Sequence, residues 1–398
     1  MDSDTKGEEF TSTISKTKRD IFVDFLRGLS VLGILFYHLV PGTPVGLGQG
    51  SMEFFFVISG FLITKTFTRR LSAGMGGLQG FAFSRLRRLL PTLCLYLIFV
   101  ALVNFLKGKD IWLIAQSAFW SLAGFYNWFQ ICSAETIHGL GGIWSLSIED
   151  QYYYLILILG SLLILSKSNK TNRLFFVFLI FYICLGAIGI LMRIVNVEYH
   201  NNSLAWGSYN TFSRLWGFAI GGFVALGSSL VDVENIRRGH IKKLINIIFV
   251  SSFALAYISL LTVQKYNPEA FLQGWLWSPI FLGVCLFAAT NFYNECPLLT
   301  DAFPRTAVPS SLSFKPFQTF RLVNWLFVFI SKVGVACYPI YLFQESDRLV
   351  GLNVHWTFSV VWALAVGFLV HNLWERRFYA FPRYAFLSVR QVPAPKNS

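Results

Sequence analysis

The chain alternates between long apolar runs and short polar stretches. A run of about 20 apolar residues is long enough to cross the hydrocarbon core of a bilayer as a helix. Windows near this length lie around residues 21–40, 50–68, 89–106, 144–165, 174–192, 209–229, 244–262, 275–292, 323–343 and 356–374. This pattern predicts an all-α protein, a polytopic membrane helical bundle of about ten transmembrane helices.

The composition agrees with this prediction. Of the 398 residues, 55% are hydrophobic, 17% are aromatic and only 13% are charged, whereas a soluble domain carries about 25% charged residues. We therefore expect one transmembrane domain over residues 21–378, with cytoplasmic tails over 1–20 and 379–398. The first apolar run is followed by no small-residue cleavage site, so we expect no removable signal peptide.

The positive charge of the chain is explained by its predicted topology. The formal net charge is +13, but the basic residues fall mainly in alternate loops, as the positive-inside rule describes. Both termini are then expected in the cytoplasm, with the protein in the cell or inner membrane if it is bacterial. The expected partner is the lipid bilayer, and no nucleic acid is expected. The six cysteines are scattered singly, so no metal site is expected.

One apolar stretch, residues 111–130, does not fit as a span. Counting it as a transmembrane helix would invert the side of every later loop. We expect it to be a re-entrant or interfacial piece on the outer side of the membrane.

The first apolar run carries ionisable side chains, which rarely persist inside a membrane helix without a partner or a function. Arg27 and His38 are eleven residues apart, so on a helix they lie about 20° apart around the axis and about 16 Å apart along it. One interpretation is a functional face with a cation and an imidazole at two depths. The alternative is that Arg27 snorkels towards the cytoplasm and His38 lies among the outer headgroups.

The predicted topology places three titratable groups at the outer end of the bundle. His38 ends the first helix there, while Glu53 begins the second and Glu149 begins the fourth. A carboxylate at Glu53, ahead of an aromatic run, requires a cation or a proton. Glu149 is a candidate to orient a histidine or bind a hydroxyl, and nearby Trp144 is also typical of an interfacial aromatic belt.

The opposite end of the bundle is expected to hold an arginine cluster. Arg85 and Arg88 would share a face of a helix, and guanidinium groups match phosphate oxygens in a bidentate geometry. This spacing suits a phosphate-binding site. The alternative is that these arginines only determine the topology.

The ordered set of motifs resembles the acyltransferase type 3 family from about Asp20 to Phe378. The motifs are the Arg27-x10-His38 pair, the run FFFVISGFLIT, Arg85-x-x-Arg88 before Pro91, and WSLSIED. The resemblance implies a membrane enzyme that moves an acyl group, expected to be acetyl, from cytoplasmic acyl-CoA to a hydroxyl of a sugar, glycan or related acceptor. Acyl-CoA would be a donor substrate, and no permanently bound cofactor is expected.

The resemblance also implies roles for individual residues. His38 would act as general base or transient acyl carrier, with Glu149 orienting its imidazole. Arg27 would line the donor tunnel or stabilise negative charge from the thioester, and Arg85 and Arg88 would bind the donor phosphates. The expected substrate-binding residues are Glu53, Trp144, Tyr338 and Gln344.

The sequence departs from the family pattern at four positions. Glu53 stands where aspartate is common, and Cys337 and Gln344 replace the usual Ser and His of S-Y-x-x-Y-L-x-H. Arg377 replaces the Pro of E-R-P-F. The change at position 344 means either that this position is not catalytic or that this member uses a different acceptor.

Two other classes of protein remain as alternatives. A secondary transporter or flippase would also have many helices with buried charges, although no internal repeat of the transporter type is evident. A protein with an acyltransferase-like fold that only binds and senses its ligand would also fit the missing histidine at position 344.

Overall fold

A computed structural model of the chain describes residues 21–133, 135–166, 171–199, 207, 209–230, 239–261, 268–292, 318–352 and 354–379. These ranges contain helices joined by turns and loops, which confirms the all-α prediction. Most of both predicted tails, residues 1–20 and 380–398, lie outside them. The helices are α1 (Ile21–Leu39), α2 (Val45–Leu71), α3 (Gly74–Leu106), α4 (Ile111–Ala123), α5 (Tyr126–Cys132), α6 (Ile143–Leu165), α7 (Thr171–Tyr199), η2 (Phe212–Arg214), α8 (Leu215–Ser228), α9 (Gly239–Leu261), α10 (Pro268–Asn291), α12 (Gln318–Val335), α13 (Cys337–Phe343), α14 (Ser346–Leu349), α15 (Trp356–Val370), the π-helical η5 (His371–Glu375) and α16 (Arg376–Tyr379).

Each of the ten predicted windows coincides with a helix or a pair of consecutive helices. By length and apolarity, six helices of the described residues can cross a bilayer: α1, α2, α3, α6, α7 and α15 with its extension to Phe378. A seventh span is formed if α12 and α13, which meet at a bend of 72°, are counted together. The chain is therefore a polytopic helical membrane protein, with six or seven such spans in its described part and shorter apolar helices over Ile111–Ala123, Leu244–Ser259 and Trp275–Asn291.

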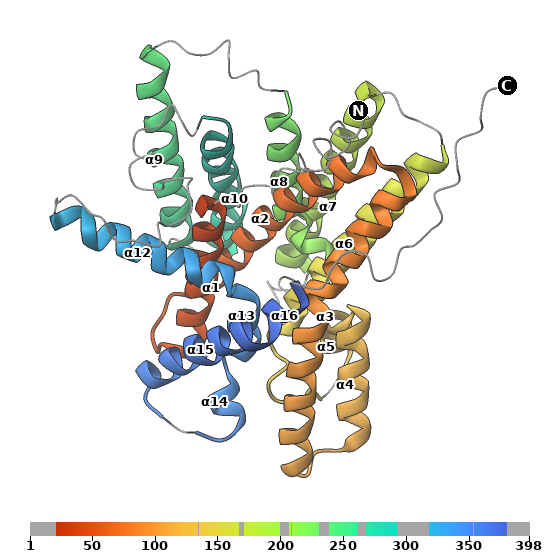
Figure 1. Cartoon of the computed structure of the whole chain (residues 1–398), viewed down its shortest axis with the longest axis vertical. Coiled ribbons are helices and arrows are strands. Elements are labelled where there is room, and N and C mark those ends of the chain that lie inside the picture. The colour runs from red at the N-terminus through yellow and green to blue at the C-terminus, as the bar shows by residue number, and fades with distance from the viewer. Residues whose placement is uncertain are drawn as a thin grey trace, which may run out of the picture.

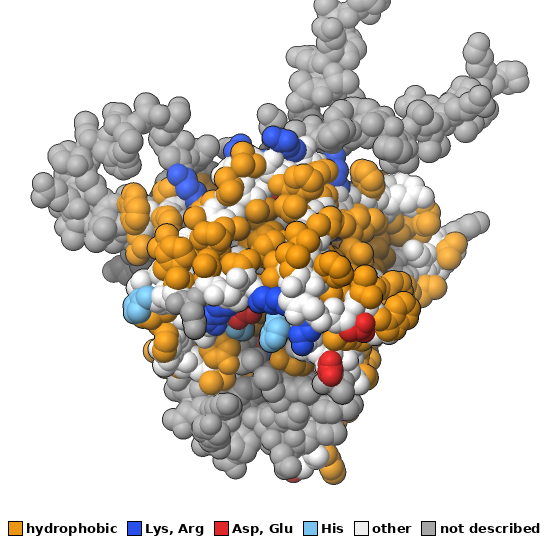
Figure 2. Space-filling model, turned by 90° about the horizontal axis from the view of Figure 1, so that it is seen from below, with side chains coloured by type: hydrophobic (Ala, Val, Ile, Leu, Met, Phe, Trp, Pro, Cys, Tyr) orange, Lys and Arg blue, Asp and Glu red, His pale blue; other side chains and the backbone are white. Residues whose placement is uncertain are grey.

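The outer surface of the bundle is suited to lipid. Large apolar side chains are exposed along many helices, for example Ile98 at 68% and Leu106 at 75% on α3. A monomeric soluble protein rarely exposes such extended apolar surface. Figure 2 shows hydrophobic side chains over a broad area of the described surface, with a band of charged and histidine side chains along one side of it and basic side chains along the other.

The stretch 111–130 folds back on itself beside α6. It forms α4 and α5, which are separated at Gly124, where φ is +75°. The side-chain amide of Gln151 donates to the carbonyl oxygen of Gly124 (2.7 Å), and the amide N–H of Tyr126 donates to Ser147 Oγ (3.1 Å). The turn between α4 and α5 therefore packs against the first turns of α6, and the re-entrant or interfacial position of this stretch in the membrane stays a prediction.

The centre of the bundle depends on close helix packing. Helix α1 packs against α2 and α12, and α2 packs against α8 (Figure 1). A Cβ atom added to Gly334 of α12 would lie 1.7 Å from the carbonyl oxygen of Asp24, so only glycine fits there. Small residues allow such close approach of membrane helices. This contact holds the first helix, which carries Arg27 and His38, against the rest of the bundle.

Candidate functional site

A pocket lined by positive side chains lies between α1, α2, α3, α6 and α13, and we call it the basic pocket. It encloses about 560 Å³ when the space at its mouth is included. It brings together five of the residues that the sequence predicts to be functional: Arg27, Arg85, Arg88, Glu149 and Tyr338. Three guanidinium groups face one carboxylate, so the lining favours an anionic ligand.

The arginines of α3 stand deeper in the bundle than expected. Helix α3 has 33 residues, more than the roughly 20 that one span needs, and Arg85 lies about 16 Å along it from its first residue. The guanidinium of Arg85 lies over the ring of Tyr153, 5.2 Å from its centroid, and that of Arg27 lies 5.9 Å from the centroid of Phe55. The arginines therefore share a pocket with Glu149, whereas the sequence placed them at the opposite end of the bundle.

Glu149 belongs to the basic pocket by its hydrogen bonds as well. Its Oε1 atom accepts a hydrogen bond from the Tyr153 hydroxyl at 2.8 Å and one from Ser59 Oγ at 3.3 Å. Tyr153 thus links the carboxylate of Glu149 to the guanidinium of Arg85. These contacts do not include His38, which Glu149 was expected to orient.

The carboxylate beside His38 is Glu345. His38 lies in the last turn of α1, and its Nδ1 atom is 3.5 Å from Glu345 Oε1, with both side chains about one-third exposed. Arg348 donates to the carbonyl oxygens of His38 (2.9 Å) and Leu39 (3.4 Å). Glu345 and Arg348 therefore hold the side chain and the backbone of the same histidine, at the end of α1.

Sequence reasoning missed the role of Glu345, although a signal was present. Glu345 follows Gln344 directly at the end of an apolar helix, and Arg348 is three residues further along. Two charges at this spacing share one face of a helical turn. What the sequence alone does not give is that α14 folds back against the end of α1.

A second, smaller pocket is lined by Glu345, and we call it the Glu345 pocket. It encloses about 240 Å³ with its mouth included, and Gln344, Tyr96 and Tyr341 also line it. Tyr341 lines the basic pocket as well. Its hydroxyl donates to the carbonyl oxygen of Gly142 at 2.6 Å and lies 2.7 Å from Ser145 Oγ. Tyr341 therefore lies at the boundary between the basic pocket and the Glu345 pocket.

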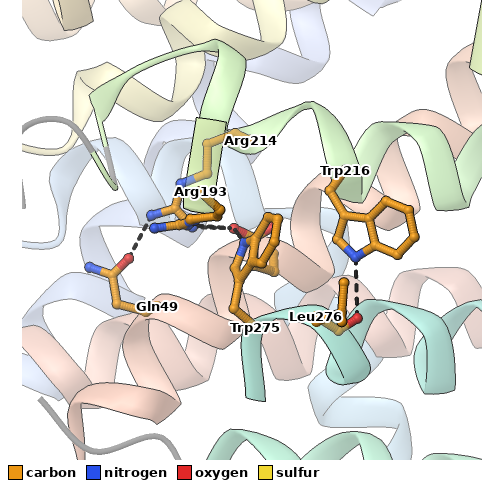
Figure 3. Close-up of polar contacts among 7 residues, drawn as sticks. Gln49, Arg193, Arg214, Trp216, Trp275 and Leu276 are labelled. Carbon is orange, nitrogen blue, oxygen red and sulfur yellow. Dashed lines mark hydrogen bonds and ion pairs between the residues drawn. The ribbon is translucent and has the colours of Figure 1, made fainter. Parts of the chain in front are cut away.

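Glu53 lies elsewhere, in a buried ion-pair cluster. Figure 3 labels its partners Arg193, Arg214 and Trp275. Helix α2 begins at Val45, so Glu53 stands about two turns inside it, where it is 1% exposed. Its Oε1 atom accepts hydrogen bonds from Arg214 and from Trp275 Nε1 (2.7 Å), and Arg193 Nη2 is 3.5 Å away. Arg214 also donates to Gln49 Oε1 at 2.6 Å.

This cluster changes the expectation for Glu53. The predicted cation is present twice, as Arg193 and Arg214, both of which are fully buried. The predicted position at the helix start, beside His38, is wrong because α2 begins earlier than its apolar window. The sequence signal for the two partners was an arginine within or next to the apolar windows 174–192 and 209–229.

The remaining predicted substrate-binding residues occupy three different places. Trp144 is 7% exposed and packs under Arg214, whose guanidinium carbon is 5.2 Å from the ring centroid. The Tyr338 hydroxyl donates to the carbonyl oxygen of Leu89 at 3.1 Å, at the wall of the basic pocket. Gln344 lines the Glu345 pocket. Across the described ranges, histidine, cysteine and acidic side chains form no group of three or more that could hold a metal ion.

Comparison with known proteins gives a consistent result. Residues 20–389 match a family described as an acyltransferase domain. The O-acetyltransferase OatA of Staphylococcus aureus (strain NCTC 8325 / PS 47) is 30% identical over 356 residues, which cover 83% of this chain and 54% of the relative. A second protein, of S. aureus (strain COL), is provisionally named an O-acetyltransferase; it is 30% identical over 324 residues, 78% of this chain and 50% of the relative.

The chain spans about half the length of the curated relatives that it matches. No solved structure matches it significantly. The family match nevertheless covers nearly the whole chain, including all the residues of both pockets. The chain therefore belongs to the acyltransferase type 3 family of integral membrane proteins.

Proposed function

We propose that this protein transfers an acetyl group from acetyl-CoA to a hydroxyl group of a sugar, glycan or related acceptor across a membrane. The observation that carries the proposal is the basic pocket, which meets the Glu345 pocket at Tyr341. Acetyl-CoA is an anion with several phosphates and a long flexible arm that ends in a thioester. The three arginines of the basic pocket suit the phosphates, and the thioester would lie towards Tyr341 and the Glu345 pocket, whose Glu345 contacts His38.

The arginines of the basic pocket would bind the donor. Arg85 and Arg88 would hold phosphate oxygens through bidentate hydrogen bonds. Arg27 lines the same pocket from α1 and would stabilise negative charge along the donor arm or on the thioester oxygen. Glu149 and Tyr153 would keep Arg85 in place from the opposite wall, because Tyr153 contacts both.

His38 would carry out the proton transfer. As general base it takes the proton of the acceptor hydroxyl, whose oxygen attacks the thioester carbonyl. The C–O ester bond forms, the C–S bond breaks, and the proton passes to the CoA thiolate. Glu345 would hold the Nδ1–H of His38, so that Nε2 is the basic nitrogen. In the alternative role of acyl carrier, the same Nε2 atom would hold the acetyl group transiently.

The orientation in the membrane follows from this division of tasks. The basic pocket would open to the cytoplasm, where acetyl-CoA is made, and the His38 end would face the other side. Both termini would then be cytoplasmic, and the reaction would modify an acceptor outside the cytoplasm.

Acetyl-CoA binding to the purified full chain tests the proposal directly. A ligand that binds the folded state raises the melting temperature. Saturating acetyl-CoA should therefore raise the melting temperature, whereas acetate alone should leave it unchanged. Radiolabelled acetyl transfer to a mixture of glycans should accompany the binding. Solute uptake into proteoliposomes without stabilisation by acetyl-CoA would instead favour a transporter.

A further inference from the structure

The Glu345 pocket contains a buried amide whose oxygen has no hydrogen-bond partner among the described residues. Gln344 is 4% exposed and lines this pocket, and its Oε1 atom accepts no hydrogen bond from the described residues. A buried polar atom is nearly always paired with protein, water or a ligand. The oxygen of Gln344 therefore indicates that a group enters the pocket and donates a hydrogen bond to it.

The direction of the amide follows from its neighbours. A Cβ atom built on Gly142 would lie 3.5 Å from Gln344 Nε2, so the amide nitrogen lies beside the backbone of Gly142. The carbonyl oxygen is the other branch of the same amide group. Gly142 lines the pocket too, so the amide lies across its wall.

The other polar groups of the pocket also leave acceptors for a ligand. The Tyr96 hydroxyl donates its proton to the carbonyl oxygen of Gly139 at 2.5 Å, and the Tyr341 hydroxyl donates to that of Gly142 at 2.6 Å. A hydroxyl group has a single proton, so neither tyrosine has a proton left to offer. The side-chain acceptors that remain are the oxygen of Gln344, the carboxylate of Glu345 and the tyrosine oxygens, and the donor beside them is the amide nitrogen of Gln344.

The two pockets therefore differ in what they recognise. The basic pocket presents donors on three arginines and suits an anion. The Glu345 pocket presents more side-chain acceptors than donors and suits a neutral or cationic molecule that is rich in hydroxyl or amino groups. Glu345 lines this pocket, and its Oε1 atom is 3.5 Å from His38 Nδ1, so one side chain connects the pocket to the imidazole.

We propose that the Glu345 pocket is the acceptor subsite, in which Gln344 Oε1 accepts a hydrogen bond from a hydroxyl adjacent to the one that is acylated. The identity of the pocket as an acceptor subsite rests on the function proposed above. The ligand class is a molecule with neighbouring hydroxyl groups, such as a sugar ring. A lone alcohol would leave the Gln344 oxygen unpaired and would bind more weakly.

The test is a binding measurement that does not depend on acetyl transfer. The full chain in lipid nanodiscs is titrated with methyl glycosides of glucose, galactose and N-acetylglucosamine, and binding is followed by saturation-transfer NMR. Each sugar is compared with its monodeoxy and deoxyfluoro forms. Fluorine replaces the hydroxyl oxygen in position and polarity but cannot donate a hydrogen bond.

We expect one ring position at which the deoxy and the deoxyfluoro sugars both bind about tenfold more weakly than the parent, the order of effect of one hydrogen bond. Gln344→Met should remove this difference. Gln130→Met is the matched control, because Gln130 also has a buried oxygen without a partner among the described residues but lines neither pocket. It should leave the difference intact.

Several results would overturn the proposal. They are the absence of binding by every glycoside, equal binding of parent and deoxy sugars at every position, and deoxyfluoro sugars that bind as well as their parents. The sugar series uses the unmutated protein, so it decides even if Gln344→Met folds poorly. A Gln344-dependent preference without any acetyl transfer would refute the proposed function and leave a sugar-binding pocket, whereas acetyl transfer without the preference would refute only the subsite.

Discussion

The Nδ1 atom of His38 and the Oε1 atom of Glu345 are 3.5 Å apart, and they come from opposite ends of the chain. Arg348, three residues beyond Glu345, binds the carbonyl oxygens of His38 and Leu39. One short segment therefore contacts both the imidazole ring of His38 and the backbone at the end of α1. This arrangement resembles the acid–histidine pairs in which a carboxylate fixes the tautomer of a general base.

Removal of the Glu345 carboxylate should slow turnover without weakening donor binding. In Glu345→Gln the imidazole loses the group that fixes its tautomer, and we expect kcat to fall by about 10²-fold, within the range that general base catalysis contributes. The KM for acetyl-CoA should stay close to that of the unmutated protein, and Glu345→Asp should recover part of the rate. Steady-state kinetics with varied acetyl-CoA measure both constants.

The same assay distinguishes Glu345 from Glu149 as the partner of His38. Glu149→Gln loosens Tyr153 and Arg85 in the basic pocket, so its main effect should be a raised KM for acetyl-CoA. A large loss of kcat in Glu149→Gln together with normal kinetics in Glu345→Gln would show that Glu149 orients the histidine after all.

The arginines of α3 should act on the donor alone. We expect Arg85→Gln and Arg88→Gln each to raise the KM for acetyl-CoA by about tenfold, because each removes a charge-assisted hydrogen bond to phosphate. Arg87→Gln is the control, since Arg87 lies on the same helix with the same charge but does not line the basic pocket. Equal effects of all three variants, or equal effects on donor and acceptor KM, would indicate that these arginines only determine the membrane topology.

The Glu53 cluster should affect stability more than it affects donor binding. Breaking a buried ion pair by removal of one partner costs about 3–5 kcal/mol. Glu53→Gln leaves the guanidinium groups of Arg193 and Arg214 close together, whereas Arg214→Met leaves one arginine with one carboxylate. The melting temperature should therefore fall more in Glu53→Gln than in Arg214→Met.

Glu135→Gln is the control for this comparison, since Glu135 is exposed, and its melting temperature should be unchanged. If Glu53→Gln has the same melting temperature as the control but no longer binds sugar, then Glu53 contacts the substrate, as the sequence predicted.

The contact between α1 and α12 should admit no side chain at Gly334. A methyl group there meets the carbonyl oxygen of Asp24, and overpacking of this kind costs about 1–3 kcal/mol. At Gly76 of α3 an added Cβ meets no atom within 4 Å, so Gly76→Ala should be neutral or slightly stabilising because alanine favours helix. Thermal unfolding of the two variants measures the difference, and similar melting temperatures would contradict the close packing of α1 and α12.

Much of the fold could be predicted because membrane helices leave a strong sequence signal. All ten apolar windows contain helix, since the backbone of a membrane segment has few other ways to pair its polar groups. The ends of the helices were harder: α2 begins five residues before its window and α3 fifteen residues before, because polar and glycine-rich turns extend the helices beyond their apolar parts. These extensions moved Glu53 and Arg85 away from the places expected of them.

The residues that line the site could be predicted better than the contacts between them. Arg27 and Glu149 were predicted to be functional ionisable groups on membrane helices, and Arg85 and Arg88 to be a phosphate-binding pair. These four side chains line one pocket. The pairing of His38 with Glu345 depends on the bend of 72° between α12 and α13 and on the return of α14 to the end of α1. No periodicity in the sequence encodes that approach.

In the proposed mechanism, His38 performs the chemistry on a donor that is bound elsewhere in the bundle. The most direct measurement compares acetyl transfer and acetyl-CoA binding in purified His38→Ala. We predict that transfer is abolished while acetyl-CoA still raises the melting temperature as in the unmutated protein, because the basic pocket does not include His38. Near-normal transfer by His38→Ala would contradict the account.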